Sequence, residues 1–364
     1  METTTDLPPG LEHCVFYCRA GFEKECAAEI SDRAAKLGIN GVLKQEADTG
    51  FVIFSPHDSQ KASALLKKIT FDSLIFARQM FGALSEITGL PPGDRIGPII
   101  AALKAKSIAV GGVMIETADA EASKPILPFC KSFRPHIEKA LRSEGILTEG
   151  SETAGLRLHL FFLTSDRVYA GISALDNSSP LSMGIVRLKF PGQAPSRSTL
   201  KLEEAMLVFL TRQQRDKQLR PGLRAVDLGA APGGWTFQLV QRGMKVTAVD
   251  NGLMAPTLLA SGLVHHIRAD GFAYSPAKPV DWMVCDIVEQ PARIAGLVGR
   301  WMERGWCRRS IFNLKLPMKK RYEEIDRCSA LIWKQLPKTG AQFSLRIKHL
   351  YHDREEVTGY VAAL

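Results

Sequence analysis

Short apolar runs alternate along the C-terminal half of the chain with longer stretches whose apolar residues recur at helical spacing. The runs predict buried strands, and the stretches predict the helices between them. The first five predicted strands are 225–228, 245–249, 264–267, 281–285 and 310–314. Two longer strands, 342–351 and 355–363, close the chain as a hairpin. This pattern predicts a mostly parallel α/β sheet with one antiparallel strand near its edge.

The N-terminal half mixes strand-like and helical segments without a long regular alternation. The predicted strands are 14–18, 50–54, 75–80, 113–117, 156–162 and 167–172. The predicted helices are 22–36, 58–69, 93–106 and 129–143. The last two strands of this half alternate apolar and polar residues across a short gap, which predicts a hairpin. A compact α/β arrangement is therefore expected here as well.

Turn-forming residues separate the two halves. The segments 177–180 (Asn-Ser-Ser-Pro) and 190–195 (Phe-Pro-Gly-Gln-Ala-Pro) are typical of a linker and a turn. The predicted segments are an α/β unit over 1–90, a second α/β domain over 91–178, a linker over 179–195 and a Rossmann-like domain over 196–364. The serines that begin the last segment predict the start of a helix near residue 199.

A glycine-rich loop joins the first strand of the Rossmann-like domain to its helix. The loop, 229–234, reads Gly-Ala-Ala-Pro-Gly-Gly and follows a strand that carries Asp227 near its end. Glycine lets a cofactor approach bare backbone and permits unusual dihedral angles. The spacing differs from the Gly-x-Gly-x-x-Gly of dinucleotide sites, and the proline removes an amide that a pyrophosphate would need. The loop therefore favours an S-adenosylmethionine site, and a plain tight turn is the alternative.

Polar residues follow four of the predicted strands, and the carboxyl ends of parallel strands form the ligand-binding rim of such a sheet. Asp250 follows the second strand, where it could accept hydrogen bonds from both ribose hydroxyls or close the turn at 250–252. Asp270 follows the third strand and could contact an adenine amine or, again, form a turn. Asp286 and Lys315 follow the fourth and fifth strands.

Lys315 stands out because apolar residues surround it in the sequence, and lysine is rarely buried without a partner. Partial burial would favour its neutral amine, which would suit it to act as a base. Lys201 would add a second cation nearby, and Asp286 would hold the ammonium of Lys315. A hydroxyl acceptor needs such a base, since an alcohol is a poor nucleophile. Together, Lys201, Asp286 and Lys315 favour a ribose 2′-hydroxyl as the methyl acceptor. The alternative interpretation of these residues is an ordinary Lys–Asp ion pair.

Charge and composition narrow the function classes. Residues 191–364 hold 26 of the 47 Lys and Arg residues but 16 of the 38 Asp and Glu residues, so the positive excess is confined to this half. A basic domain suits a polyanion such as nucleic acid, although solvated basic faces are the alternative. The 7 cysteines show no paired ligand spacing, which indicates reduced thiols and no metal. Without a signal peptide or membrane-spanning run, a cytoplasmic protein is expected.

Several sequence blocks resemble the FtsJ-like ribose methyltransferases. These blocks are 196–202 (Ser-Arg-Ser-Thr-Leu-Lys-Leu), 231–235 (Ala-Pro-Gly-Gly-Trp), 284–286 (Val-Cys-Asp) and 313–320 (Asn-Leu-Lys-Leu-Pro-Met-Lys-Lys). Together with 350–358, 18–23, 116–119 and 129–131, they make nearly the whole chain similar to the bacterial 23S ribosomal RNA 2′-O-ribose methyltransferase M family. This resemblance implies a ferredoxin-like unit and a THUMP-like RNA-binding domain before the catalytic domain.

The resemblance also implies a substrate and a set of site residues. The substrate would be a cytidine in 23S ribosomal RNA or a large-subunit precursor, methylated from S-adenosylmethionine. The implied cofactor-binding residues are Ser198, Ala231, Pro232, Gly233, Gly234, Asp250, Asp270 and Asp286. The implied catalytic residues are Lys315 as proton acceptor, Lys201, Asp286 and Glu356. Glu355 and His352 remain alternatives for the fourth catalytic position.

Two other functions remain open at this point. A nicotinamide-dependent oxidoreductase would share the fold class, but the loop spacing and Lys315 argue against it. An RNA-binding ribosome assembly factor with an inactive methyltransferase domain would not need Lys315. The sequence shows no oligomerisation element, so a monomer is expected, without membrane or metal partners.

Overall fold

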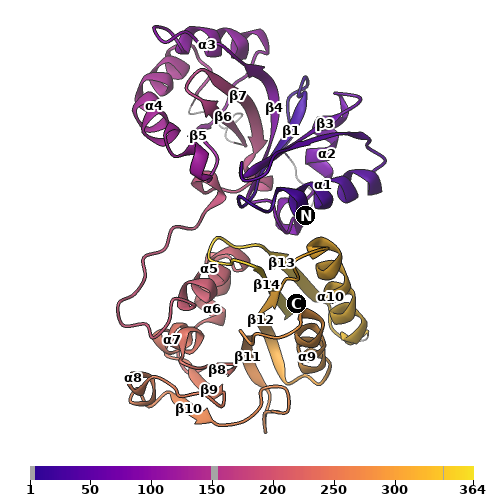
Figure 1. The fold of residues 1–364 in the computed structure, drawn as a ribbon, viewed down its shortest axis with the longest axis vertical. Helices are drawn as coiled ribbons and strands as arrows, with labels where there is room; N and C mark the ends of the chain where they lie inside the picture. Colours follow the sequence, from indigo (N-terminus) through magenta and orange to yellow (C-terminus); the bar gives the residue numbers. More distant parts are fainter. Residues whose placement is uncertain (1–4, 149–154, 339) are drawn as a thin grey trace. The chain divides into compact units, whose positions relative to one another are not determined.

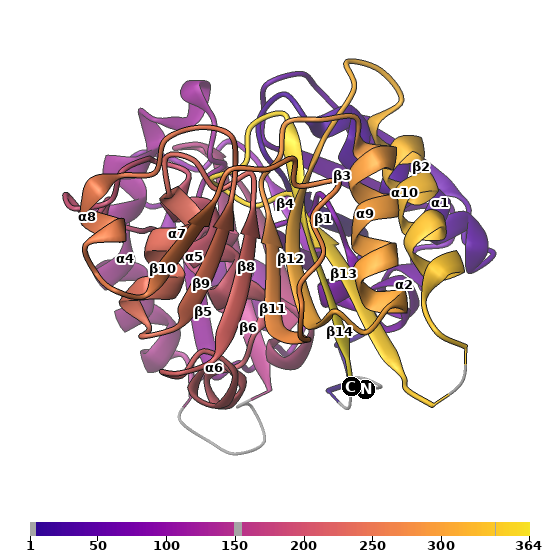
Figure 2. The same cartoon turned by 90° about the horizontal axis from the view of Figure 1, so that it is seen from below.

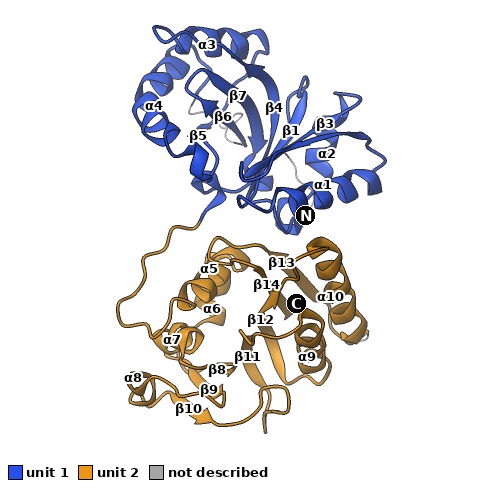
Figure 3. Ribbon diagram, in the orientation of Figure 1, with its two compact units in different colours: residues 1–185 blue, residues 186–364 orange. Residues whose placement is uncertain are grey.

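A computed structural model describes residues 5–148, 155–338 and 340–364 of the chain. The chain divides into two compact units, residues 1–185 and 186–364 (Figure 3). The division falls within the segment 179–195, where the turn-forming residues lie. Each unit is built on its own seven-stranded sheet (Figure 1).

The sheet of the first unit has the strand order β2-β3-β1-β4-β7-β6-β5. Its strands are β1 (His13–Tyr17), β2 (Gly41–Gln45), β3 (Phe51–Pro56), β4 (Gln79–Ile87), β5 (Gly112–Glu116), β6 (Leu156–Thr164) and β7 (Arg167–Ala174). The strand β4 pairs with β1 on one side and with β7 on the other. One continuous sheet therefore joins the segments 1–90 and 91–178. The predicted hairpin is confirmed as β6–β7.

The prediction from the pattern of apolar residues placed one strand of this unit at the wrong residues. The predicted strand 75–80 is wrong, because β4 begins only at Gln79. Ile75 and Phe76 are buried, but their backbone N–H groups donate to the buried carboxylate of Glu29 at 2.7 and 2.9 Å. A side chain thus satisfies this buried backbone in place of a strand partner. The helices are α1 (Glu23–Lys36), α2 (Lys61–Lys68), α3 (Ile96–Ala105) and α4 (Ile126–Ser143), and each overlaps a predicted helix.

The sheet of the second unit has the strand order β10-β9-β8-β11-β12-β14-β13. Its strands are β8 (Arg224–Leu228), β9 (Lys245–Val249), β10 (Val264–Ile267), β11 (Val280–Cys285), β12 (Cys307–Lys315), β13 (Phe343–Lys348) and β14 (Glu356–Ala363). The strands β8 to β12 pair in parallel, whereas β14 runs antiparallel to both β12 and β13. The predicted antiparallel strand near the edge is therefore confirmed, and the sheet is Rossmann-like.

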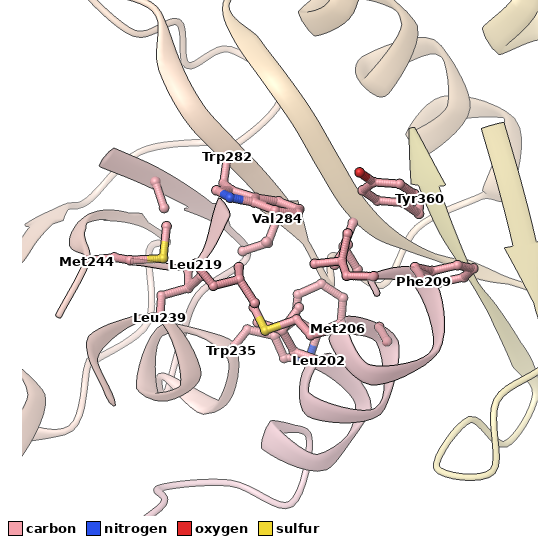
Figure 4. Packing of buried hydrophobic residues seen from close by; sticks show 14 of the residues in the cluster. Leu202, Met206, Phe209, Leu219, Trp235, Leu239, Met244, Trp282, Val284 and Tyr360 are labelled. Carbon is pink, nitrogen blue, oxygen red and sulfur yellow. The ribbon is translucent and has the colours of Figure 1, made fainter. Parts of the chain in front are cut away.

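Helices cover both faces of this second sheet. They are α5 (Thr199–Phe209), α6 (Arg212–Gln218), α7 (Gly234–Gln241), α8 (Pro256–Leu259), α9 (Pro291–Glu303) and α10 (Arg321–Gln335). Figure 2 shows α9 and α10 in front of the sheet and α5 and α7 behind it. The apolar side chains of α5 and α7 pack with Trp282, Val284 and Tyr360 into a buried core (Figure 4). The short helix α6 was not predicted, since none of its residues is buried.

Candidate active site

Strand periodicity carries polar residues to the rim on the same face as the α5/α7 core. Side chains along a strand alternate between the two faces, so residues two apart share a face. Val284 of β11 packs in that core, and the next residue on its face is Asp286. Ile311 of β12 packs in the same core and is followed on that face by Asn313 and Lys315. The polar rim is thus a continuation of the apolar core.

The strand β14 brings two more polar residues to this place from the opposite chain direction. Because β14 is antiparallel to β12, its first residue lies at the carboxyl end of β12. Glu356 is the register partner of Lys315, and Thr358 is the register partner of Asn313. Side chains opposite one another on neighbouring antiparallel strands have Cβ atoms about 5 Å apart. The register therefore places Lys315 and Glu356 side by side at the rim.

Lys201 reaches this rim from α5. Its Nζ lies 2.5 Å from Oε1 of Glu356 and 3.6 Å from Oδ1 of Asp286. The Lys201, Glu356 and Asp286 side chains are 17 %, 16 % and 21 % exposed, so solvent screens these ion pairs only partly. Burial lowers the pKa of Lys201, but Asp286 and Glu356 outweigh burial and raise that pKa above its ordinary value. Lys201 is therefore a fixed ammonium group at neutral pH.

Lys315 has a different environment from the one expected. Its side chain is exposed, although Phe312 and Leu314 before it are fully buried. The partial burial that the neighbouring apolar residues suggested is wrong, because β12 ends at this residue and the following segment 317–320 is itself exposed. The expected Asp286 partner is also wrong, since Asp286 pairs with Lys201. One lysine is thus held by carboxylates, and the other is open to solvent at the rim.

The three candidates for the fourth position have different partners. Glu356 contacts Lys201, as described above. Glu355 forms an ion pair with an arginine at the start of α10 and is more than half exposed. His352 places Nδ1 2.6 Å from a carboxylate oxygen of the buried Glu204. Of these three, Glu356 is the residue that faces both lysines.

Asp286 is held by residues that the sequence did not single out. Nδ2 of Asn313 donates a hydrogen bond to Oδ1 of Asp286 at 2.8 Å, and Oγ1 of Thr358 lies 2.8 Å from Oδ1 of Asn313. Burial raises the pKa of Asp286, while Lys201 and the Asn313 hydrogen bond oppose this rise. The sequence did offer a signal for Asn313, because it is a polar residue inside the buried run of β12, two positions before Lys315.

The glycine-rich loop turns tightly from β8 into α7. Gly229 has φ 77°, and a Cβ there would lie 2.6 Å from Cγ1 of Ile287. Gly233 has φ 117°, and a Cβ there would lie 2.2 Å from a leucine methyl of α8. A Cβ on Gly234 would lie 2.1 Å from Oγ of Ser198. Gly229 and Gly233 require glycine both for backbone dihedral angles and for close packing, whereas Gly234 requires it for packing alone. The loop brings Ser198 against the start of α7.

Two strand-end aspartates form turns beside this loop. Oδ2 of Asp250 accepts a hydrogen bond from the N–H of Ala231 at 3.0 Å, and Oδ1 accepts from the N–H of Gly252 at 2.7 Å. Oδ1 of Asp270 accepts from the N–H of Phe272 at 2.9 Å. The turn interpretation left open by the sequence is therefore present for both residues. Each carboxylate oxygen still has a second lone pair with which to accept from a ligand.

Asp227 is a further site residue for which the sequence suggested no role. It is fully buried in β8, and Oγ1 of Thr236 donates to its Oδ2 at 2.6 Å. Its Oδ1 has no hydrogen-bond partner among the described residues. Burial raises the pKa of Asp227 to about 7, and the carboxylates of Asp286 and Asp250 add to this rise. The only sequence signal for Asp227 was that an acidic residue lies near the end of the first predicted strand of the Rossmann-like domain.

The carboxylates around the loop fit the cofactor that its spacing suggests. Asp227 and Asp250 lie near the ends of neighbouring strands that flank the loop, and Asp270 follows the next strand. S-adenosylmethionine offers a sulfonium cation, an ammonium group and hydroxyl donors, which carboxylates attract. A pyrophosphate group would instead be repelled by the same charges. The unpartnered oxygen of Asp227 is a further acceptor for a donor on such a ligand.

The described part of the chain shows neither a metal-binding cluster nor a membrane-spanning helix. No group of three or more His, Cys, Asp or Glu side chains there could hold a metal ion. No helix within residues 5–148, 155–338 and 340–364 is long and apolar enough to cross a membrane. The cysteines are buried free thiols.

Three family models match successive parts of the chain. The RlmM ferredoxin-like domain matches residues 11–81. The N-terminal region of ribosomal RNA large subunit methyltransferase M matches residues 94–174. The FtsJ-like methyltransferase model, whose family uses S-adenosylmethionine as methyl donor, matches residues 194–298.

Relatives match the chain over nearly its full length. Ribosomal RNA large subunit methyltransferase M of Klebsiella pneumoniae subsp. pneumoniae is 49 % identical over 96 % of this chain and 96 % of its own. The protein of the same name from Actinobacillus pleuropneumoniae serotype 5b is 46 % identical over 96 % and 97 %. The crystal structure of TrmN from Thermus thermophilus aligns over 97 % and 99 %, at 14 % identity and a TM-score of 0.34. The chain therefore belongs to the ribosomal RNA large subunit methyltransferase M family and is an S-adenosylmethionine-dependent ribosomal RNA methyltransferase.

Proposed function

We propose that this enzyme methylates the ribose 2′-hydroxyl of a cytidine in 23S ribosomal RNA or a large-subunit precursor, with Lys315 as the proton acceptor. The observation that carries this proposal is that two lysines at the rim have different environments. Lys201 is bound between Asp286 and Glu356, whereas Lys315 is exposed opposite Glu356. The hydroxyl acceptor is inferred from this exposed amine, and the cytidine is inferred from the family resemblance alone.

The loop and the strand-end aspartates would hold the cofactor. The residues proposed to bind it are Ser198, Ala231, Pro232, Gly233, Gly234, Asp250, Asp270 and Asp286. When bound, S-adenosylmethionine supplies an electrophilic methyl group on a sulfonium centre. The side chains of the protein then have two tasks. They align the acceptor oxygen with that methyl group, and they remove the hydroxyl proton.

Lys315 performs the proton transfer in this proposal. The 2′-hydroxyl proton moves to the neutral Nζ of Lys315 as the oxygen forms its new bond to carbon. Bound S-adenosylmethionine would supply the methyl carbon and would itself be left as a neutral thioether. Lys315 then returns the proton to solvent, to which its side chain is already exposed. Positioned proton transfer of this kind contributes about 10²–10⁴-fold to rates.

Lys201 has a separate role as a fixed cation. Its ammonium group is held by Asp286 and Glu356, and its raised pKa keeps it charged. A fixed positive charge stabilises the negative charge that develops on the attacking oxygen. Glu356 and Asp286 therefore also place Lys201.

The identity of the methylated nucleoside tests this proposal. Protein-free large-subunit RNA is incubated with labelled S-adenosylmethionine and the enzyme, then digested to nucleosides that are separated by chromatography. We expect the label in 2′-O-methylcytidine. Label on a base would contradict the hydroxyl acceptor, and label on another ribose would contradict the cytidine. A bound cofactor with no label in any RNA precursor would favour the assembly-factor alternative.

A further inference from the structure

Large apolar side chains are exposed to solvent on the loops of the rim. Among the described residues, the four most exposed large apolar side chains are Met318 (92 %), Leu364 (79 %), Val288 (76 %) and Leu253 (73 %). Leu364 is the last residue of the chain. The other three follow β12, β11 and β9, whose carboxyl ends lie at the rim. Single exposed apolar residues are ordinary on a protein surface, but these three gather at the edge of the sheet that carries the site.

The loop between β12 and α10 holds Met318 in place. Leu316 is buried, and its N–H donates to the carbonyl oxygen of Glu355 at 2.8 Å. On the other side of Met318, Nε of Arg321 donates to the carbonyl oxygen of Pro317 at 3.1 Å. The guanidinium of Arg321 also forms an ion pair with the carboxylate of Glu355. The loop is therefore fixed on both sides of the residue that it exposes.

The turn after β11 exposes Val288 in a similar way. The preceding residue, Ile287, packs against the glycine-rich loop, since a Cβ on Gly229 would lie 2.6 Å from its Cγ1. The following residue, Glu289, forms an ion pair with Arg293 in the first turn of α9. Val288 thus lies between two residues that are held by other parts of the fold, and its own side chain faces solvent.

The loops that carry these two side chains flank the acceptor position. Asp286 and Asn313 extend the parallel pairing of β11 and β12 and are joined by a hydrogen bond. Val288 comes two residues after Asp286, and Met318 comes three residues after Lys315. A ribose whose hydroxyl lies at Lys315 carries its base on the neighbouring carbon atom. That base therefore lies beside the loops that expose Val288 and Met318.

A nucleobase suits an exposed methionine and valine at this place. Enzymes that act on one nucleotide take it out of its stack, and apolar side chains then cover the faces of the extruded base. Methionine is unbranched and polarisable, and it makes favourable contacts with rings. Lys319 and Lys320 follow Met318 and are exposed, which matches the phosphates on either side of a base. An apolar side chain beside two cations fits a nucleotide better than it fits an apolar protein surface.

We propose that Met318 and Val288 contact the base of the nucleotide that is methylated, after this base has left its stack in the RNA. The inference rests on the proposed function, because the ribose hydroxyl at Lys315 determines where the base lies. The two side chains cover the faces of the base and have no polar group with which to recognise its edge. They therefore hold the nucleotide in position without selecting which base it carries.

Substitutions of Met318 test the contact through kinetics. Met318→Ala removes the apolar side chain, whereas Met318→Leu retains an apolar side chain of similar volume. We expect Met318→Ala to lower kcat/KM for protein-free large-subunit RNA about 5- to 10-fold, with S-adenosylmethionine affinity unchanged. Met318→Leu should stay within about 2-fold of the wild type, because the apolar contact is kept. A wild-type kcat/KM for Met318→Ala, or equal losses for the alanine and leucine variants, would overturn the proposal.

Val288→Ala and a matched control complete this series. Val288→Ala should lower kcat/KM about 3-fold, since less apolar surface is removed. Trp333→Ala is the control, because Trp333 is an exposed apolar residue on α10 outside the rim. It should leave kcat/KM within about 2-fold. A loss for Trp333→Ala as large as that for Met318→Ala would show that exposed apolar residues of this unit matter generally, and would contradict a specific role of the rim.

Photo-cross-linking tests whether a base is what covers these side chains. Large-subunit RNA is transcribed with the photoreactive analogue of the nucleoside that is methylated, which is 5-iodocytidine in the expected case. The RNA is incubated with the full-length enzyme and S-adenosylhomocysteine, irradiated and digested. We expect mass spectrometry to find a nucleotide attached to the peptide that contains Met318 or to the one that contains Val288. Cross-links confined to other peptides would show that no base lies at these loops.

These outcomes separate the inference from the proposed function. If the methyl label is found on a base, the hydroxyl acceptor fails, while the cross-link still reports whether a base contacts Met318. If the label is in 2′-O-methylcytidine but Met318→Ala is as efficient as the wild type and the cross-links lie elsewhere, the inference fails and the proposed function stands.

Discussion

The two lysines of the rim show how local surroundings give one residue type two roles. Lys201 comes from a helix, is mostly buried and contacts two carboxylates. Lys315 ends a strand and is exposed. The sequence could identify both residues and the strand ends that hold Asp286 and Lys315. It could not predict which lysine Asp286 contacts. Lys201 lies on α5, and the order of the strands does not show which helix side chain reaches the rim.

Loss of the fixed cation should be costly for both stability and activity. Lys201→Ala leaves Asp286 and Glu356 with unpaired charges in a largely buried place. We expect a destabilisation of about 2 kcal/mol, between the values for exposed and fully buried ion pairs. Denaturant unfolding of the variant measures this change. Lys36→Ala, which breaks the exposed pair with Asp32, is the control and should cost less than about 0.5 kcal/mol. Equal effects of the two substitutions would contradict the buried pairing.

Asp227 should make the unliganded protein less stable as the pH rises. The pKa of Asp227 is about 7 in the folded protein, above its ordinary value of 3.8. The folded state therefore binds more protons than the unfolded state between these values, and stability falls as the pH rises from about 4 to about 7. Asp227→Asn lacks this effect. Its stability relative to the wild type should increase by up to about 4 kcal/mol between pH 4 and pH 7.5. A pH-independent difference in unfolding free energy would refute this assignment.

At the scale of elements, the register of β12 and β14 places the site. The alternation of apolar runs and helical stretches was enough to predict each strand of the second sheet, and the closing hairpin predicted the antiparallel strand. The register itself could not be read from apolar pattern, because a shift of two residues keeps the same faces buried. Glu356 was therefore one of three candidates until its pairing with Lys315 was known.

The turn from β8 to α7 depends on a glycine that cannot be replaced without strain. Gly229 has φ 77°, and an added Cβ would lie 2.6 Å from a side-chain atom and 3.2 Å from the backbone of Ile287. Gly229→Ala should destabilise the protein by about 1–3 kcal/mol and weaken S-adenosylmethionine binding, as measured by calorimetry. Gly296→Ala in α9 is the control, since its Cβ would meet open space. It should stabilise the protein by about 0.5–1 kcal/mol. If Gly229→Ala changed neither the stability of the protein nor its affinity for the cofactor, the turn would tolerate a side chain.

At the scale of the molecule, two units with separate sheets share one chain. The family models agree with the methyltransferase nature of the second unit, which also carries the positive excess. The predicted segments 1–90 and 91–178 share one sheet, a feature that β4 creates by pairing with strands from both. The role of 91–178 as a THUMP-like RNA-binding domain stays a prediction. Local cations such as Lys131 and Lys139 on α4 are exposed and are consistent with that prediction.

The second unit should fold and bind its cofactor alone. Residues 186–364 contain a complete sheet, its core against α5 and α7, and every residue proposed to bind S-adenosylmethionine. We expect this fragment to unfold cooperatively and to bind the cofactor within a few-fold of the affinity of the full chain. Circular dichroism and calorimetry measure the two properties. A fragment that is unfolded, or folded without affinity for the cofactor, would show that the first unit completes the site.

A comparison of Lys315→Ala with Lys319→Ala tests whether Lys315 is the proton acceptor. Both remove one exposed lysine near the rim, but only Lys315 faces Glu356 across the β12–β14 register. Single-turnover methylation of saturating large-subunit RNA is measured over a range of pH, together with cofactor binding. We expect Lys315→Ala to slow methyl transfer about 100-fold or more with unchanged cofactor affinity, and Lys319→Ala to leave the rate at saturation within a few-fold. A Lys315→Ala rate close to that of Lys319→Ala would contradict Lys315 as the proton acceptor.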